Sequence, residues 1–158
     1  MTVATDTHLG IGEVFFGEGP QRVTTLLGSC IAVTLWHRER RLGGMCHFML
    51  PRRRETSVQQ PDGRYGNEAF IILERAISRT GTRITEYEAK VFGGGTMFPD
   101  LDDPVRVSFE NVAAARRLLR ERGIPLKAEH VGGAGHRWLR FDVWSGDVWL
   151  DFHAAMKQ

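Results

Sequence analysis

The strongest constraint on the fold is a pair of apolar segments separated by a short polar tip. Residues 31–36 read Ile-Ala-Val-Thr-Leu-Trp, residues 37–40 are polar, and residues 42–50 are apolar again until Pro51 ends the run. Large and small side chains alternate along 31–36, which is the two-residue period of a β-strand. Two such runs on either side of a polar tip predict an antiparallel hairpin.

The register of this hairpin decides which side chains meet. With the turn centred on Arg38 and Glu39, Cys30 lies opposite His47 and Cys46 lies opposite Ile31. Directly opposed residues have Cβ atoms about 4.5 to 5.5 Å apart, within reach for a thiol and an imidazole. Neighbouring strand residues point to opposite faces, so Cys30 shares a face with His47 and not with Cys46. The register therefore predicts one thiol beside an imidazole and one thiol in the core.

A thiol beside an imidazole is the minimal pair of nucleophile and base. Gly28 and Ser29 directly precede Cys30, where backbone N–H groups could hold an oxyanion. Thr24 lies six residues upstream, where its hydroxyl or carbonyl could orient the imidazole. The residues alone leave a second interpretation open, in which Cys30 is a small buried side chain and the histidine is structural.

The other expected elements are strands at 11–16 and 23–27, a helix at 67–80, a strand at 86–92 and a helix from the N-cap Ser108 to Gly123. Near the end of the chain, Ser145-Gly146 predicts a two-residue hairpin loop. That loop pairs Val143 with Val148, Phe141 with Leu150 and Leu139 with Phe152. Strands, helices and strands in this order predict an α/β fold whose mixed or antiparallel sheets are covered by two helices.

Composition limits the class of protein. The 158 residues, 42% of them hydrophobic, suit one domain spanning 1–158. Two cysteines are too few for a disulfide framework, and neither a leader segment nor a membrane-spanning run is evident, so we expect a cytosolic protein with free thiols. A net charge of +2 does not indicate a nucleic-acid partner. The cluster Arg52-Arg53-Arg54 is interpreted as a solvated corner.

Two further chemistries are weighed and disfavoured. A metal site built from Cys30, Cys46, His47 and His37 lacks any C-x-x-C or H-x-x-x-H spacing. The glycines at 93–95 are not followed by Lys-Ser/Thr, as a phosphate-binding loop would be, and instead predict a close backbone approach at a strand end.

Several segments resemble known motifs in their order along the chain. They are Thr-Thr-Leu-Leu-Gly-Ser-Cys at 24–30, Gly-Gly-Met-Cys-His-Phe-Met-Leu-Pro at 43–51, Arg-Tyr-Gly-Asn at 64–67, Lys-Val-Phe-Gly-Gly-Gly-Thr-Met-Phe at 90–98, Asn111 and Gly132-Gly133. Together they resemble the CheD family of bacterial chemoreceptor glutamine deamidases, including the spacing between Cys30 and His47. The segment 132–137 departs from the family pattern, as does Ser108.

The resemblance implies roles for these residues. Cys30 would be the nucleophile, His47 the base and Thr24 the third catalytic residue, with Gly28 and Ser29 positioning the oxyanion. The implied fold is an α/β sandwich similar to the catalytic domain of cytotoxic necrotising factors. A substrate loop is expected at Gly93, Gly94, Gly95, Thr96 and Met97.

The implied reaction turns glutamine side chains of methyl-accepting chemotaxis receptors into glutamate through a thioester, without a cofactor or metal. A CheC-type phosphatase is an implied partner, and neither nucleic acid nor membrane insertion is expected. Two alternatives stay open. The same Cys-His site could run transamidation or peptide hydrolysis, or the chain could act as a non-catalytic binding module.

Overall fold

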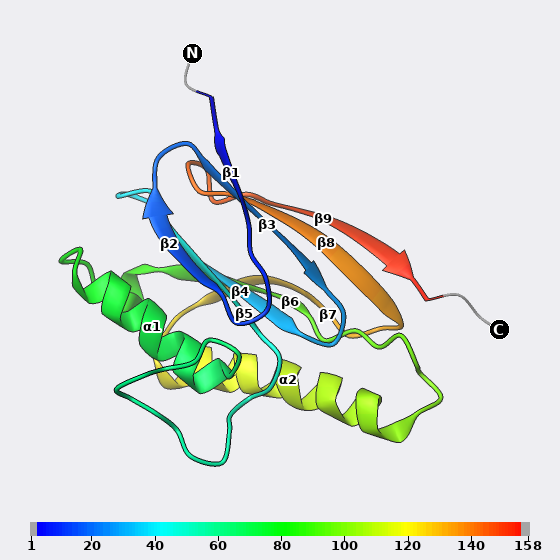
Figure 1. Cartoon of the computed structure of the whole chain (residues 1–158). Helices are drawn as coiled ribbons and strands as arrows, with labels where there is room; N and C mark the ends of the chain where they lie inside the picture. The colour runs from blue at the N-terminus through cyan, green and yellow to red at the C-terminus, as the bar shows by residue number, and fades with distance from the viewer. Residues whose placement is uncertain (1–2, 156–158) are drawn as a thin grey trace.

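The computed structural model describes residues 3–155, which form three layers (Figure 1). A five-stranded sheet in the order β2-β5-β4-β6-β7 lies in the middle. Helices α1 and α2 cover one of its faces, and a four-stranded sheet in the order β1-β3-β8-β9 lies on the other side. Both sheets are mixed, because β1 pairs in parallel with β3 and β6 with β7, whereas the other pairings are antiparallel.

The elements in chain order are β1 (Thr5–His8), β2 (Val14–Glu18), β3 (Gln21–Leu27), β4 (Ile31–His37), β5 (Leu42–Phe48), α1 (Gly66–Ser78), the 3-10 turn η1 (Ile84–Glu86), β6 (Glu88–Gly93), α2 (Asp102–Glu121), β7 (Leu126–Val131), β8 (Gly135–Asp142) and β9 (Val148–Ala154). The expected α/β class with mixed sheets and two helices is confirmed. Both helices cover the five-stranded sheet, so the outer face of the four-stranded sheet carries no helix within residues 3–155. In the same range, no helix has the length and apolar character to cross a lipid bilayer.

The hairpin of β4 and β5 is buried on both faces, which explains its nearly continuous apolar sequence. One face packs against the helices through Ile31, Val33 and Cys46. The other face packs against the second sheet and includes Ala32 and Met45. Two cores therefore share one hairpin, and any polar side chain on it needs a partner within the protein.

The register of this hairpin differs from the prediction by two residues. Ala32 pairs with His47 and Val33 with Cys46, and the turn runs on to Arg41, which adopts a positive φ of 53°. The predicted pairs of Cys30 with His47 and of Ile31 with Cys46 are therefore wrong. A two-residue shift keeps every side chain on its face, so Cys30 and His47 still share one.

The C-terminal hairpin shows the same kind of shift. Phe141 pairs with Val148 and Leu139 with Leu150, so the predicted pairings are wrong although the predicted core face is right. The turn is longer than Ser145-Gly146, because the Gly146 N–H donates to the Asp142 carbonyl and closes a wider loop.

Other features of the fold also differ from expectation. Helix α2 begins at Asp102, not at Ser108, because two acidic residues favour its first turn and Pro104 is tolerated there. Ser108 lies inside the helix, where its hydroxyl donates to the Pro104 and Gly95 carbonyls. Strands β2 and β3 follow each other closely but belong to different sheets, and strand β1 was not expected.

The loop before α1 is held by a buried carboxylate. Glu68 is fully buried and accepts hydrogen bonds from Nε and Nη2 of Arg53, at 2.8 and 2.7 Å. The interpretation of residues 52–54 as a solvated corner is therefore wrong for Arg53, whereas Arg52 and Arg54 are exposed.

This contact predicts unequal effects of two arginine substitutions. Arg53→Met leaves the Glu68 carboxylate buried without its cation and should lower the free energy of unfolding by about 2 kcal/mol. The matched control Arg52→Met removes an exposed side chain and should change it by less than about 0.5 kcal/mol. Urea denaturation measures both, and equal effects would show that the pair contributes nothing specific.

Candidate active site

Cys30 and His47 both face the space between the two sheets. Cys30 directly precedes β4, and its side chain, 9% exposed, belongs to the core between the sheets. His47 on β5 is 2% exposed and pairs with Ala32 of β4. Because Ala32 follows Cys30 by two residues, the side chains of Cys30 and His47 are diagonal neighbours on one face. His47 Nε2 has no hydrogen-bond partner within residues 3–155, and no hydrogen bond joins it to the Cys30 thiol.

The other nitrogen of His47 is held by Thr25. Thr25 is fully buried on β3, and its Oγ1 lies 2.7 Å from His47 Nδ1 and 2.7 Å from the Leu9 carbonyl oxygen. A carbonyl only accepts, so the single Thr25 hydroxyl hydrogen donates to Leu9 and its oxygen accepts from Nδ1–H. This places the proton of neutral His47 on Nδ1 and leaves Nε2 with a free lone pair. Nε2 is therefore the nitrogen that could accept a proton.

Thr24, the predicted third residue, does not contact the imidazole. Its hydroxyl lies 3.3 Å from Nδ1 of His8, and its carbonyl accepts from the Leu9 N–H. The cause is strand alternation, because Val23, Thr25 and Leu27 point into the sandwich and Thr24 therefore points out. The orienting contact expected from Thr24 is corrected to Thr25.

Burial sets the charge state of the pair. It lowers the pKa of His47 to about 4, an effect strengthened by nearby His8 and partly offset by the Leu9 carbonyl and Glu13. Burial also raises the pKa of the Cys30 thiol above its ordinary value. At neutral pH the resting site thus holds a protonated thiol and a neutral imidazole.

The backbone around Cys30 is fixed by three consecutive hydrogen bonds. The carbonyl of Gly28 accepts from Gly95 N–H at 3.0 Å, that of Ser29 from Asn111 Nδ2 at 3.1 Å, and that of Cys30 from Gly94 N–H at 2.9 Å. In the part of the chain the structure describes, the N–H groups of Ser29 and Cys30 donate to no acceptor. The turn therefore presents two free donors next to the thiol.

The glycines at 93–95 lie against this turn. Gly93 has a φ of 113°, and a Cβ there would collide with the Cys30 carbonyl oxygen. A Cβ at Gly95 would collide with the Gly135 carbonyl oxygen in the same way. The predicted close backbone approach is confirmed, and its partner is the turn that carries Cys30.

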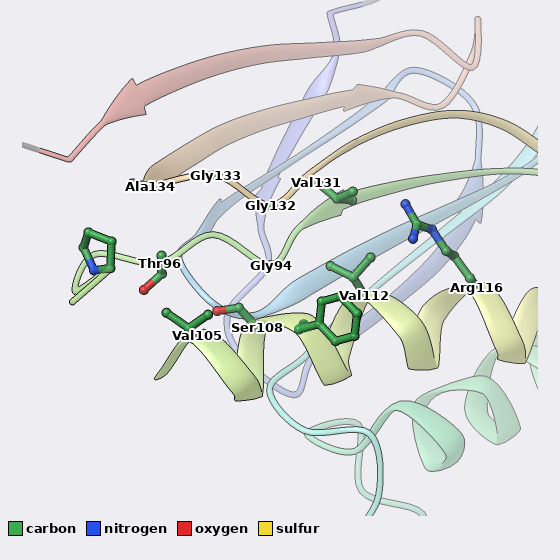
Figure 2. Close-up of a pocket in the computed structure, with 12 residues that line it drawn as sticks. Gly94, Thr96, Val105, Ser108, Val112, Arg116, Val131, Gly132, Gly133 and Ala134 are labelled. Carbon is green, nitrogen blue, oxygen red and sulfur yellow. The ribbon is translucent and has the colours of Figure 1, made fainter. Parts of the chain in front are cut away.

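The far side of the glycine loop forms an apolar groove of about 470 Å³. Figure 2 shows Gly94 and Thr96 along one wall, with Val105, Ser108 and Val112 of α2 opposite. Phe109 also lines it and is 74% exposed, whereas Met97 is exposed without lining it. The expected substrate loop thus contributes two residues to a groove next to the Cys30 turn.

The remaining candidates lie apart from this site. Cys46 is fully buried among core side chains on the opposite face, and burial raises the pKa of its thiol to about 12. His37, at the far end of β4, contacts Glu86 at 3.0 Å. Among residues 3–155, no three His, Cys, Asp or Glu side chains cluster as metal ligands would.

Sequence reasoning missed three contributors. Thr25 was detectable, because it alternates with the apolar Val23 and Leu27. The Leu9 carbonyl was not, since a main-chain acceptor has no side-chain signature. Arg137 is 1% exposed and binds the Gly132 carbonyl and His130, bracing the loop whose backbone pairs with Gly93 and Thr96.

Comparisons with known proteins agree with one another. The family described as "CheD chemotactic sensory transduction" matches residues 49–152. A protein of Dechloromonas aromatica named "Probable chemoreceptor glutamine deamidase CheD 3" is 48% identical over 148 residues, which are 93% of this chain and 87% of that protein. The "Probable chemoreceptor glutamine deamidase CheD" of Pseudomonas savastanoi is 50% identical over 146 residues, 90% of this chain and 81% of its own.

A more distant relative extends the comparison. The protein of the same name from Methanococcus maripaludis is 31% identical over 147 residues, 93% of this chain and 95% of its own length. The chain belongs to the CheD family.

Proposed function

We propose that this protein deamidates glutamine side chains of chemoreceptors, with Cys30 as nucleophile and His47 as base. The observation that carries the proposal is the geometry around His47. Its Nδ1 proton is held by Thr25, and its free Nε2 shares a face with the Cys30 thiol. The names of the relatives supply the substrate class, chemoreceptor glutamine.

The first half of the reaction forms a thioester. The Cys30 thiol gives its proton to His47 Nε2, and the sulfur attacks the carbon of the glutamine side-chain amide. The N–H groups of Ser29 and Cys30 stabilise the negative oxygen of the tetrahedral intermediate. His47 then returns the proton to the leaving nitrogen, so ammonia departs and the acyl group stays on sulfur.

The second half releases the product. His47 Nε2 takes a proton from water, and the hydroxide attacks the thioester carbon. The carbon–sulfur bond then breaks, and the sulfur takes the proton back from Nε2 to regenerate the thiol and the neutral imidazole. Glutamine has become glutamate. In both halves, the hydrogen bond from Nδ1–H to Thr25 Oγ1 stabilises the imidazolium as it forms. The Thr25 hydroxyl also donates to the Leu9 carbonyl, and this second hydrogen bond polarises Oγ1 and makes it a stronger acceptor.

The groove beside the Cys30 turn is the proposed contact for the receptor. Its apolar lining and the exposed Phe109 suit a receptor segment that presents apolar side chains beside the reactive glutamine. Thr96 of the glycine loop lines this groove, and the exposed Met97 follows it in the chain. A CheC-type phosphatase as partner stays a prediction.

Substitution of the two cysteines tests the central assignment. Cys30→Ala should lower the rate of ammonia release from a purified chemoreceptor cytoplasmic fragment by roughly 10⁴-fold or more, because it removes the sulfur that forms the acyl intermediate. Cys46→Ala, the matched control in the core, should keep the rate within about threefold. Mass spectrometry of receptor peptides separates deamidation from crosslinking or cleavage, and retained deamidation in the Cys30 variant refutes the mechanism.

A second comparison separates the two neighbouring threonines. Thr25→Val keeps the shape but removes the acceptor of the Nδ1 proton, so kcat should fall by about 10- to 100-fold. Thr24→Val should leave kcat within about threefold, because that hydroxyl faces His8. Thr25→Ser retains the hydroxyl and should recover most of the rate. If kcat fell in the Thr24 variant and not in the Thr25 variant, the assignment of Thr25 as the orienting residue would be wrong.

The buried histidine predicts an unusual pH profile. Because burial lowers the pKa of His47 to about 4, the free enzyme keeps its base neutral throughout the weakly acidic range. The acid limb of kcat/KM should therefore lie near pH 4 and not near 6.5, measured by ammonia release across a pH series. A midpoint near 6.5 would mean that the imidazole is not desolvated as the structure has it.

The same shift gives an independent check on stability. The folded pKa lies below the unfolded value of 6.5, so the unfolded state binds the extra proton and stability falls as the pH drops from 6.5 towards 4. This group should contribute up to about 3 kcal/mol of that fall. In urea denaturation at a series of pH values, His47→Gln should lack this part of the fall in the free energy of unfolding. If the variant's free energy of unfolding fell with pH as steeply as that of the wild type, the lowered pKa would be contradicted.

A further inference from the structure

Asn111 joins the two segments that carry the proposed nucleophile and base. It lies on the inner face of α2 and is fully buried. Its Nδ2 group donates to the Ser29 carbonyl at 3.1 Å and to the Met49 carbonyl at 2.9 Å. Ser29 directly precedes Cys30, and Met49 follows His47 by two residues. A single amide therefore contacts the backbone beside both reactive side chains.

Because the peptide bond is planar, the contact with the Ser29 carbonyl also fixes the direction of the Cys30 N–H. In a trans peptide the carbonyl and the following N–H point in opposite directions, and no cis peptide occurs in residues 3–155. The Ser29 carbonyl and the Cys30 N–H belong to one peptide unit. When Asn111 draws that carbonyl towards α2, it turns the Cys30 N–H away from α2, towards the space between the sheets that the thiol faces.

Among the described residues, Asn111 supplies the hydrogen bond that holds the Ser29 carbonyl, whereas main-chain groups hold the carbonyls on either side. The Gly28 carbonyl accepts from the main-chain N–H of Gly95, and the Cys30 carbonyl accepts from that of Gly94. The Ser29 carbonyl has no main-chain donor among the described residues. Serving both Ser29 and Met49 takes two hydrogens on one nitrogen, and the Asn111 amide supplies them without burying a charge.

Resting on the proposed function, we infer that Asn111 is a positioning residue for the oxyanion site. It touches neither the substrate nor the thiol. It fixes the plane of the peptide between residues 29 and 30, so that the Cys30 N–H is aimed before the substrate arrives. Donors oriented in advance stabilise developing charge without reorganisation during the reaction, and small misplacements of such groups are costly.

Asn111→Leu tests this role, since leucine has a similar volume and no donor. With a chemoreceptor cytoplasmic fragment as substrate, kcat should fall by about 10- to 100-fold while KM stays within about threefold. Alkylation of Cys30 by iodoacetamide forms no oxyanion, so its rate should stay within about threefold. The isosteric Asn111→Asp, with at most one hydrogen to donate, gives the same test if the leucine variant does not fold.

Tyr87→Phe is the stability control. It removes a buried hydroxyl contact with Thr82 at the opposite end of β6 and should leave both rates unchanged. Two results would overturn the inference: a wild-type kcat in a folded Asn111 variant, or an alkylation rate that falls as far as kcat, which would place Asn111 in support of the thiol–imidazole pair. Deamidation by Cys30→Ala would instead refute the proposed function, so the two failures are distinguishable.

Discussion

Burial of the β4–β5 hairpin on both faces is the constraint on which the site depends. The hairpin separates two cores, one against the helices and one against the second sheet. A histidine on such a hairpin is removed from water, and it needs a partner on the facing sheet. Thr25 on β3 is that partner, so the contact that satisfies a buried polar group also selects which imidazole nitrogen stays free.

The fold class and the face of each strand were predictable from the sequence, whereas the pairings were not. Both hairpins shift by two residues because alternation determines which side a residue faces but leaves even shifts open. Turn geometry decides between them, through the positive φ of Arg41 in one case and the wider loop closed by Gly146 in the other. Neither feature has a strong local signal, since arginine seldom marks a left-handed position.

In the candidate site too, the alternation of side chains along a strand predicts which face a residue lies on but not which residues it contacts. Cys30 and His47 remain on one face after the shift, so the pairing error does no harm to the proposed pair. The hydroxyl that contacts the imidazole belongs to Thr25 and not to Thr24, because strand parity and not distance along the chain decides which side chain points inward. The roles of the Leu9 carbonyl and of Asn111 depend on contacts between distant segments, which no local pattern encodes.

A neutral resting pair has a consequence for selectivity. Because burial keeps the thiol protonated and the imidazole uncharged, Cys30 is a weak nucleophile until a proton can move to Nε2. That transfer creates two charges in a desolvated site, and it is favoured most when an amide carbon accepts the sulfur and the free N–H groups receive the oxygen. A ligand that does not place a carbonyl against those donors gains none of this stabilisation. In the proposed mechanism, the preformed backbone of the Cys30 turn therefore serves specificity as well as rate.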